Sequence, residues 1–227
     1  MTEERQAIGL EVRFPDKAQR KGLGGFSRKK PMAEVSVVLE GGVTLDIVVP
    51  VRVGRLLSEA EGPFPCEPDH AFEYIHGLES KVALTMLTEM LGRRDHSVSE
   101  AREKLAGYGF RPEEIEPCLE RACSLRFLDD ARFASYFIEE RKRRGWGRRK
   151  IEVELKHKGV DPADVPGYPD AFFSADEDLD RAASLLERKR IPETRPYEKL
   201  VRFLMGKGFA YDVASRAVRE RLDGDGR

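Results

Sequence analysis

The sequence of 227 residues predicts a mostly α fold: an elongated array of three tandem three-helix repeats, preceded by a small N-terminal β-hairpin region. Two runs of β-branched residues joined by two glycines predict the hairpin. A helical apolar pattern that recurs at offsets of 50 and 49 residues predicts the repeats. We expect a β-hairpin region and linker over 1–70, and helical repeats over 77–126, 127–172 and 173–222.

The predicted hairpin consists of EVSVVLE (34–40) and VTLDIVV (43–49), separated by Gly41-Gly42. Two glycines between such runs are a common signal for a tight hairpin turn. The apolar stretch VRVGRLL (51–57) that follows predicts a brief helix.

Two further segments of this region predict irregular structure. EGPFPCEPDH (61–70) contains three prolines and predicts a linker. Residues 15–31 combine several Lys, Arg and Gly residues and predict a mobile arm. Because the two predicted strands pair with each other, we expect that removal of residues 1–70 leaves the helical content nearly intact.

From about residue 77 the same apolar pattern occurs three times. Each copy has a leucine four residues after an apolar residue, then a glycine and another apolar residue. The corresponding positions are Ala101, Leu105, Gly109 and Phe110; Ile151, Leu155, Gly159 and Val160; and Leu200, Leu204, Gly208 and Phe209. The preceding helix keeps the register at Ala83 and Leu87, Phe133 and Phe137, and Ala182 and Leu186. Such repeats stack because no single copy buries its apolar face alone.

Residues at the helix ends agree with this register. Ser97 and Glu100 form a capping-box pattern, and the repeated glycine supplies the left-handed position that ends the second helix of each repeat. Pro112 suits a first helical turn, where a missing N–H costs nothing. In the second repeat Pro166 and Pro169 interrupt the expected third helix, so we predict that it is short.

The most unusual stretch is RKRRGWGRRK (141–150), with two glycines around the single tryptophan, Trp146. Asp129 is the expected N-cap of the preceding helix, and cations at the end of that helix suit its dipole. The basic residues continue into the start of the next helix, where the dipole disfavours them, which indicates an anionic partner surface. The candidate binding residues are Arg141, Arg143, Arg144, Trp146, Arg148, Arg149 and Lys150.

Alternatives stay open at this stretch. It can be a nucleic-acid patch, a protein-docking surface or a solvated helix junction. Trp146 can fill the gap between repeats, which we favour because aromatic residues in tight turns usually pack inward, or stack on a base or an arginine.

Composition narrows the class of protein. The formal net charge is −1 with 36% charged residues, which argues against general coating of nucleic acid. No apolar run approaches the roughly 20 residues of a membrane span, and the start has no secretory pattern. Three sparse cysteines, Cys66, Cys118 and Cys123, suit a reducing environment. We therefore expect a cytoplasmic protein with no membrane contact.

Residue types that carry catalysis do not form a convincing constellation, so we expect no enzyme activity, no cofactor and no metal site. Cys66, His70 and His76 have loosely metal-like spacing but lack a second cysteine nearby. GKGF (206–209) is not a phosphate loop, because the preceding glycine of that motif and a leading strand are missing.

Segment 127–160, FLDDARFASYFIEERKRRGWGRRKIEVELKHKGV, closely resembles the central part of the RecX regulatory proteins. That part combines an LDD-x-x-FA helix with a Gly-aromatic-Gly turn and a helix that ends in Lys-Gly. LGRRDHSVSEAREKL (91–105) is similar to the first repeat of the family, and LVRFLMGKGF (200–209) more loosely to the last. Ala101 stands where the family commonly has leucine.

The resemblance implies an all-helical regulator without enzyme activity. Family members bind the RecA recombinase filament and lower its ATP hydrolysis and strand exchange, which regulates recombination in DNA repair and the SOS response. Some also contact DNA. We therefore expect a monomer whose partner is the RecA filament, with single-stranded DNA as a second partner. A helical-repeat protein acting directly on single-stranded DNA, or a passive scaffold, are the alternatives.

Overall fold

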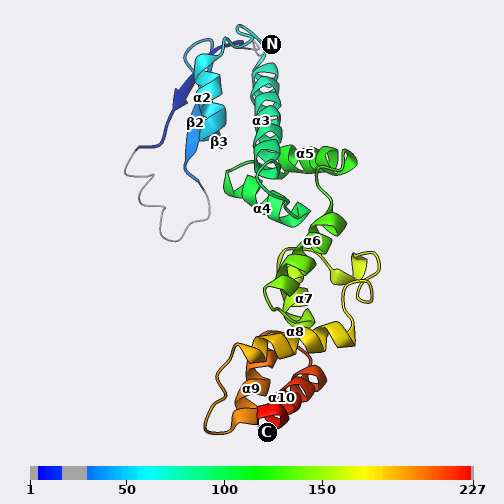
Figure 1. Ribbon diagram of the computed structural model, residues 1–227. Coiled ribbons are helices and arrows are strands. Elements are labelled where there is room, and N and C mark those ends of the chain that lie inside the picture. Colours follow the sequence, from blue (N-terminus) through cyan, green and yellow to red (C-terminus); the bar gives the residue numbers. More distant parts are fainter. Residues whose placement is uncertain (1–4, 17–29, 226–227) are drawn as a thin grey trace. The chain divides into compact units, whose positions relative to one another are not determined.

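The computed structural model describes residues 5–16 and 30–225, and its contacts divide the chain into two compact units, Met1–Leu128 and Asp129–Arg227 (Figure 1). It is mostly helical with a small sheet near the N-terminus, which confirms the predicted fold class. Most of the arm expected over 15–31 lies outside the described residues.

The sheet of unit 1 has three antiparallel strands in the order β1-β2-β3: β1 (Ala7–Arg13), β2 (Met32–Leu39) and β3 (Thr44–Pro50). Gly41 and Gly42 join β2 to β3 at φ values of +83° and +79°. Left-handed backbone at two successive positions explains why both are glycine. The hairpin and the following helix α2 (Val51–Glu59) match the expectation, whereas β1 was not expected.

Three helices complete unit 1: α3 (Pro68–Leu91), α4 (Val98–Gly107) and α5 (Pro112–Ser124). The predicted N-cap of α4 is confirmed, because the Ser97 hydroxyl accepts a hydrogen bond of 3.0 Å from the Glu100 N–H. Pro112 lies in the first turn of α5, as predicted.

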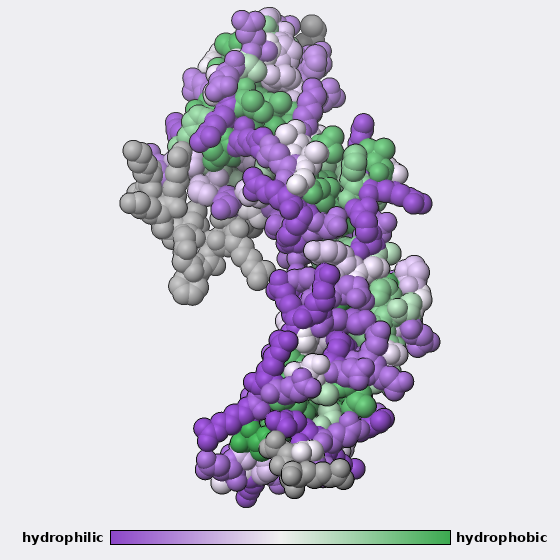
Figure 2. All heavy atoms as spheres, in the orientation of Figure 1, coloured by the Kyte–Doolittle hydropathy of each residue, from purple (hydrophilic) through white to green (hydrophobic). Residues whose placement is uncertain are grey.

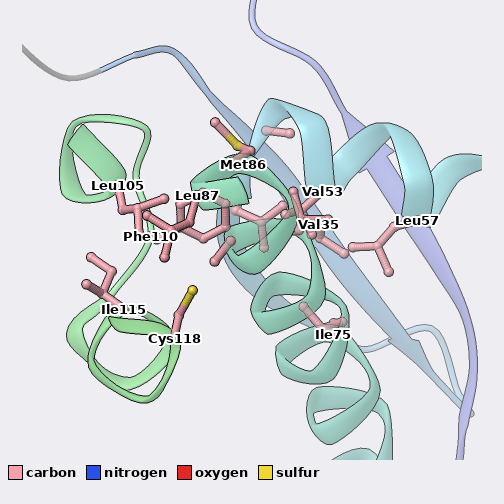
Figure 3. Packing of buried hydrophobic residues seen from close by; sticks show 14 of the residues in the cluster. Val35, Val53, Leu57, Ile75, Met86, Leu87, Leu105, Phe110, Ile115 and Cys118 are labelled. Atoms are coloured by element: carbon pink, nitrogen blue, oxygen red, sulfur yellow. The ribbon is translucent and has the colours of Figure 1, made fainter. Parts of the chain in front are cut away.

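Sheet and helices of unit 1 share a single core, which differs from the separable N-terminal region that the sequence suggested. Val35 of β2 and Leu57 of α2 lie in one cluster with Ile75 of α3 and Leu105 of α4 (Figure 3). Strand pairing satisfies only the backbone, and the buried face of the sheet needs the helices to cover it.

The described part of unit 2 contains helices and no strand. Its helices are α6 (Asp130–Arg143), α7 (Arg148–His157), α8 (Ala175–Glu187), α9 (Pro196–Gly206) and α10 (Tyr211–Asp225). Between α7 and α8 the chain forms only a short 3₁₀ helix, Pro162–Asp164, which confirms that the third helix of this repeat is short.

The predicted repeat register is confirmed by burial. Leu105, Leu155 and Leu204 have no solvent exposure, and the apolar residues four positions earlier are equally buried. The glycines that follow have φ values of +97°, +73° and +95° at Gly109, Gly159 and Gly208 respectively, as left-handed helix ends require.

On the face shown in Figure 2, hydrophilic side chains cover most of the surface and hydrophobic atoms show only in patches. Among the described residues, no helix combines the length and the apolar character needed to span a membrane. The three cysteines carry no disulfide, and Cys66 and Cys118 are buried.

Candidate functional site

The basic turn, residues 141–150, joins α6 to α7. Asp129 caps the start of α6 as predicted, with its carboxylate accepting a hydrogen bond of 2.9 Å from the Arg132 N–H. Gly145 ends the helix region at a φ of +76°, and a side chain there would meet Leu185 of α8. The first glycine of the GWG sequence therefore has a conformational and a packing role.

Gly147, the second glycine, lets the backbones of two repeats touch. Its N–H donates to the Lys207 carbonyl at 2.8 Å, and the Arg149 N–H donates to the Gly208 carbonyl at 3.0 Å. A Cβ at Gly147 would lie 2.3 Å from the carbonyl carbon of Gly208, closer than any real contact allows. The turn between α6 and α7 is thereby fixed against the end of α9.

Trp146 is half-buried and packs against the core cluster of the second repeat. Its ring lies 4.9 Å from the Arg141 guanidinium and 4.2 Å from the Lys150 ammonium, both cation–π contacts. Its carbonyl accepts a hydrogen bond of 2.8 Å from Arg181. These contacts favour the packing role of Trp146 over base stacking.

Several cations of the turn are engaged within unit 2. Arg144 pairs with Glu140, and Arg141 approaches the same carboxylate at 3.1 Å. Arg148 donates to Glu152 at 2.8 Å, and this hydrogen bond raises the pKa of the Arg148 guanidinium. Their charge is partly compensated, so they are weaker candidates for a partner contact than the sequence alone suggested.

Arg143 and Arg149 differ from these residues. Both side chains are exposed, and within the described ranges neither has an ion pair, hydrogen bond or ring contact through its guanidinium. Arg143 ends α6 and Arg149 lies in the first turn of α7. They are the two cations of the turn best able to bind an external anion.

A second basic region in unit 1 escaped the sequence analysis. A cavity of about 580 Å³ lies beside α2 and the end of α3, and it is lined by Arg52, Arg55, Arg93, Lys30 and Tyr108 among others. Glu89 neutralises Arg52 through two hydrogen bonds of 2.7 and 2.9 Å. These basic residues are far apart in the sequence and come together only in the fold, so no run of basic residues in the sequence predicts the cavity.

The loosely metal-like trio of the sequence is not reproduced as a cluster in the described part of the chain. Cys66 forms a strand-like bridge with Ala7, and burial raises the pKa of its thiol. His70 is exposed. Only His76 joins other potential ligands, and these are Glu79 and Glu114.

Comparison with known proteins identifies the family. Residues 129–165, which include α6 and α7, match the family model "RecX, second three-helix domain". The chain is 35% identical over 147 residues to the regulatory protein RecX of Prosthecochloris aestuarii (strain DSM 271 / SK 413), covering 64% of this chain and 94% of the relative. With the regulatory protein RecX of Thermobifida fusca (strain YX), identity is 32% over 151 residues, covering 63% and 80%.

Solved structures agree on the fold. A crystal structure of regulatory protein RecX superposes with a TM-score of 0.56 at 18% identity, covering 92% of this chain and 96% of the other. The crystal structure of RecX from Lactobacillus salivarius gives a TM-score of 0.55 at 16% identity, covering 62% and 95%. By its sequence relatives and its fold, the chain belongs to the RecX family of regulatory proteins.

Proposed function

We propose that this regulator binds the RecA recombinase filament and lowers its ATP hydrolysis and strand exchange, acting in the cytoplasm without catalysing a reaction itself. The family membership supports the regulatory role. The proposed contact surface is the basic turn, residues 141–150.

One observation carries the choice of surface: Arg143 and Arg149 are exposed, uncompensated cations on either side of a turn with a fixed backbone. A guanidinium without an internal partner can form charge-assisted, bidentate hydrogen bonds with carboxylates or phosphates. Because the turn is already ordered by its contact with the end of α9, little conformational entropy is lost when a partner binds.

The test is RecA ATPase on single-stranded DNA, measured against increasing amounts of this protein. In the variant Arg143→Glu/Arg149→Glu, we expect that at least about tenfold more protein is needed for half inhibition, since reversed charges repel the partner's anions. Exposed substitutions shift stability by less than about 0.5 kcal/mol, so the fold should persist.

The matched control is Arg188→Glu/Arg202→Glu, which changes the net charge of unit 2 equally at two exposed positions outside the basic turn. It should inhibit like the unaltered chain. Equal inhibition by both double variants would remove the basic turn from the contact. The cavity variant Arg55→Glu/Arg93→Glu would then be the next to examine.

Direct action on single-stranded DNA is the second candidate, because the same two arginines also suit phosphates. Such binding needs no RecA, and its affinity falls steeply as salt rises. Binding to naked single strands should therefore be measured at several salt concentrations. If the protein coats DNA at the concentrations that inhibit RecA, competition for DNA replaces filament binding as the explanation.

A further inference from the structure

A cluster of three potential metal ligands lies inside unit 1, away from the basic turn. His76 and Glu79 stand one turn apart on α3, and Glu114 lies in the first turn of α5. Both carboxylates are almost fully buried, with side-chain exposures of 1% and 4%, whereas His76 is 40% exposed. The two carboxylates thus form the buried side of the cluster, and the histidine forms the side that solvent reaches.

The spacing of the ligand atoms is that of a coordination sphere. His76 Nδ1 lies 3.0 Å from Glu79 Oε2 and 3.5 Å from Glu114 Oε1. Ligands about 2.1 Å from a metal are about 3.0 Å apart in octahedral geometry and about 3.4 Å apart in tetrahedral geometry. All three ligand atoms lie within 4.8 Å of one another, so small side-chain movements are enough for them to meet one cation.

A cationic atom already lies among these ligands. Nη2 of Arg111, the residue before α5, is 2.7 Å from Glu79 Oε2 and 2.8 Å from Glu114 Oε1, and it also contacts His76 Nδ1. The Arg111 side chain is 39% exposed and can turn outward. Its backbone N–H donates to Glu114 Oε2 at 2.9 Å, a bond that survives when the guanidinium leaves.

The charges of the cluster leave room for a divalent ion. Two buried carboxylates face one guanidinium, and Glu79 Oε1 is buried without a hydrogen-bond partner in the described part of the chain. A buried carboxylate oxygen without a partner is costly, and metal coordination is one way to satisfy it. The unpaired oxygen shows that the arginine alone does not satisfy the Glu79 carboxylate.

We propose that His76, Glu79 and Glu114 form a binding site for a divalent first-row transition ion, such as zinc, and that Arg111 occupies this position when the ion is absent. One imidazole and two carboxylates are a ligand set that zinc accepts, with open positions for water. The bound ion joins α3 to α5 and stabilises the first repeat. This proposed metal site does not depend on the proposed RecA contact.

The experiment uses the full chain after treatment with a chelator, titrated with zinc ions in a calorimeter and followed by thermal melting. At a hundredfold excess of zinc over its Kd, the melting temperature should rise by on the order of 5 °C. His76→Ala should abolish both the heat of binding and this rise. The same substitution at His70, which is exposed on the same helix, should leave both unchanged.

Arg111→Ala distinguishes a metal site from an ordinary ion-pair cluster. It removes the competing cation, so zinc should bind about tenfold more tightly, and added zinc should restore the stability lost with the arginine. Glu114→Gln should weaken binding. The proposal is overturned if zinc binds no more tightly to the Arg111→Ala protein, or if His76→Ala and His70→Ala bind zinc equally well.

Discussion

Unit 1 and unit 2 contain the same helical repeat pattern but bury it in different ways. Among the described residues of unit 1, one cluster of 23 buried hydrophobic residues extends through the sheet and α2–α5. In unit 2 two smaller clusters, of eight and nine such residues, belong to successive repeats. The same pattern can thus be buried against a sheet, as in unit 1, or within a single helical repeat, as in unit 2.

The largest effect should come from removing the sheet together with α2. Within residues 1–66, the described part supplies nine of the 23 residues of this cluster, each contributing on the order of 1–2 kcal/mol. Their sum is comparable to the whole stability of a domain, about 5–15 kcal/mol. A chain that starts at residue 67 should lose the helical circular dichroism of α3, α4 and α5.

Trp146 makes the comparison with unit 2 measurable, because the single tryptophan of the chain lies there. Its fluorescence melting curve should be the same in the truncated and the full chain. Helical dichroism that remains undiminished after the truncation would show that the sheet is a separable appendage, as the sequence first suggested.

A smaller effect should follow from shortening one core side chain of unit 2. Leu155 is fully buried in the cluster of eight, so Leu155→Ala should lower the free energy of unfolding by about 2–5 kcal/mol. Val153 lies on the same helix and is 52% exposed. Val153→Ala should change the free energy of unfolding by less than about 0.5 kcal/mol. Urea denaturation measures both variants, and an equal loss of unfolding free energy in Leu155→Ala and Val153→Ala would contradict the repeat register.

The repeat register could be predicted from sequence because it depends on local periodicity. Leu105, Leu155 and Leu204 are buried as their spacing indicated. Strand β1 could not be predicted in this way, because its partner β2 begins 19 residues after it ends and the two pair only through the fold. The shared core of sheet and helices follows from the same long-range contacts.

The candidate sites were predicted less completely than the fold. A run of basic letters locates the turn at 141–150, but it does not show that Glu140 and Glu152 compensate Arg144 and Arg148. Nor does it reveal the cluster around His76, because Glu114 reaches that histidine from another helix. Local patterns predict elements, whereas side-chain pairing between elements requires the structure.

The contact between repeats of unit 2 should be more tolerant than its cores. Gly147→Ala places a Cβ against the backbone of Gly208, and such overpacking typically costs about 1–3 kcal/mol. A Cβ added to Gly206, at the end of α9, would meet no described atom within 4 Å, so Gly206→Ala should be neutral or stabilising by up to about 1 kcal/mol. Urea denaturation followed by Trp146 fluorescence compares the two; an unharmed Gly147→Ala protein would show that the turn and the end of α9 are not in contact.

The smallest expected effect is a difference between the two units in how their stability depends on pH. His96 of unit 1 is only 3% exposed, and burial, with repulsion from Arg94 and Lys104, lowers its pKa. A lowered pKa means that the unfolded chain takes up the proton first. The contribution of His96 is therefore fully present above the ordinary value of about 6.5 and is lost as pH falls through that value toward the folded pKa.

Glu79 has the opposite effect on the stability of unit 1 as pH falls. Burial and repulsion from Glu114 raise the pKa of its carboxyl, so the folded chain takes up this proton before the unfolded chain does. The comparison must therefore be made between the unaltered chain and His96→Gln, by helical dichroism melting at pH 7.5 and pH 5.5. We expect the acid-induced drop in melting temperature to be smaller in His96→Gln. The one histidine in the sequence of unit 2 is His157, which is exposed. Melting of unit 2, followed by Trp146 fluorescence, should therefore show the same pH response in the unaltered chain and in His96→Gln. The two proteins differ only at residue 96. An identical acid-induced drop in their melting temperatures, followed by helical dichroism, would therefore mean that the buried imidazole is not the group that titrates.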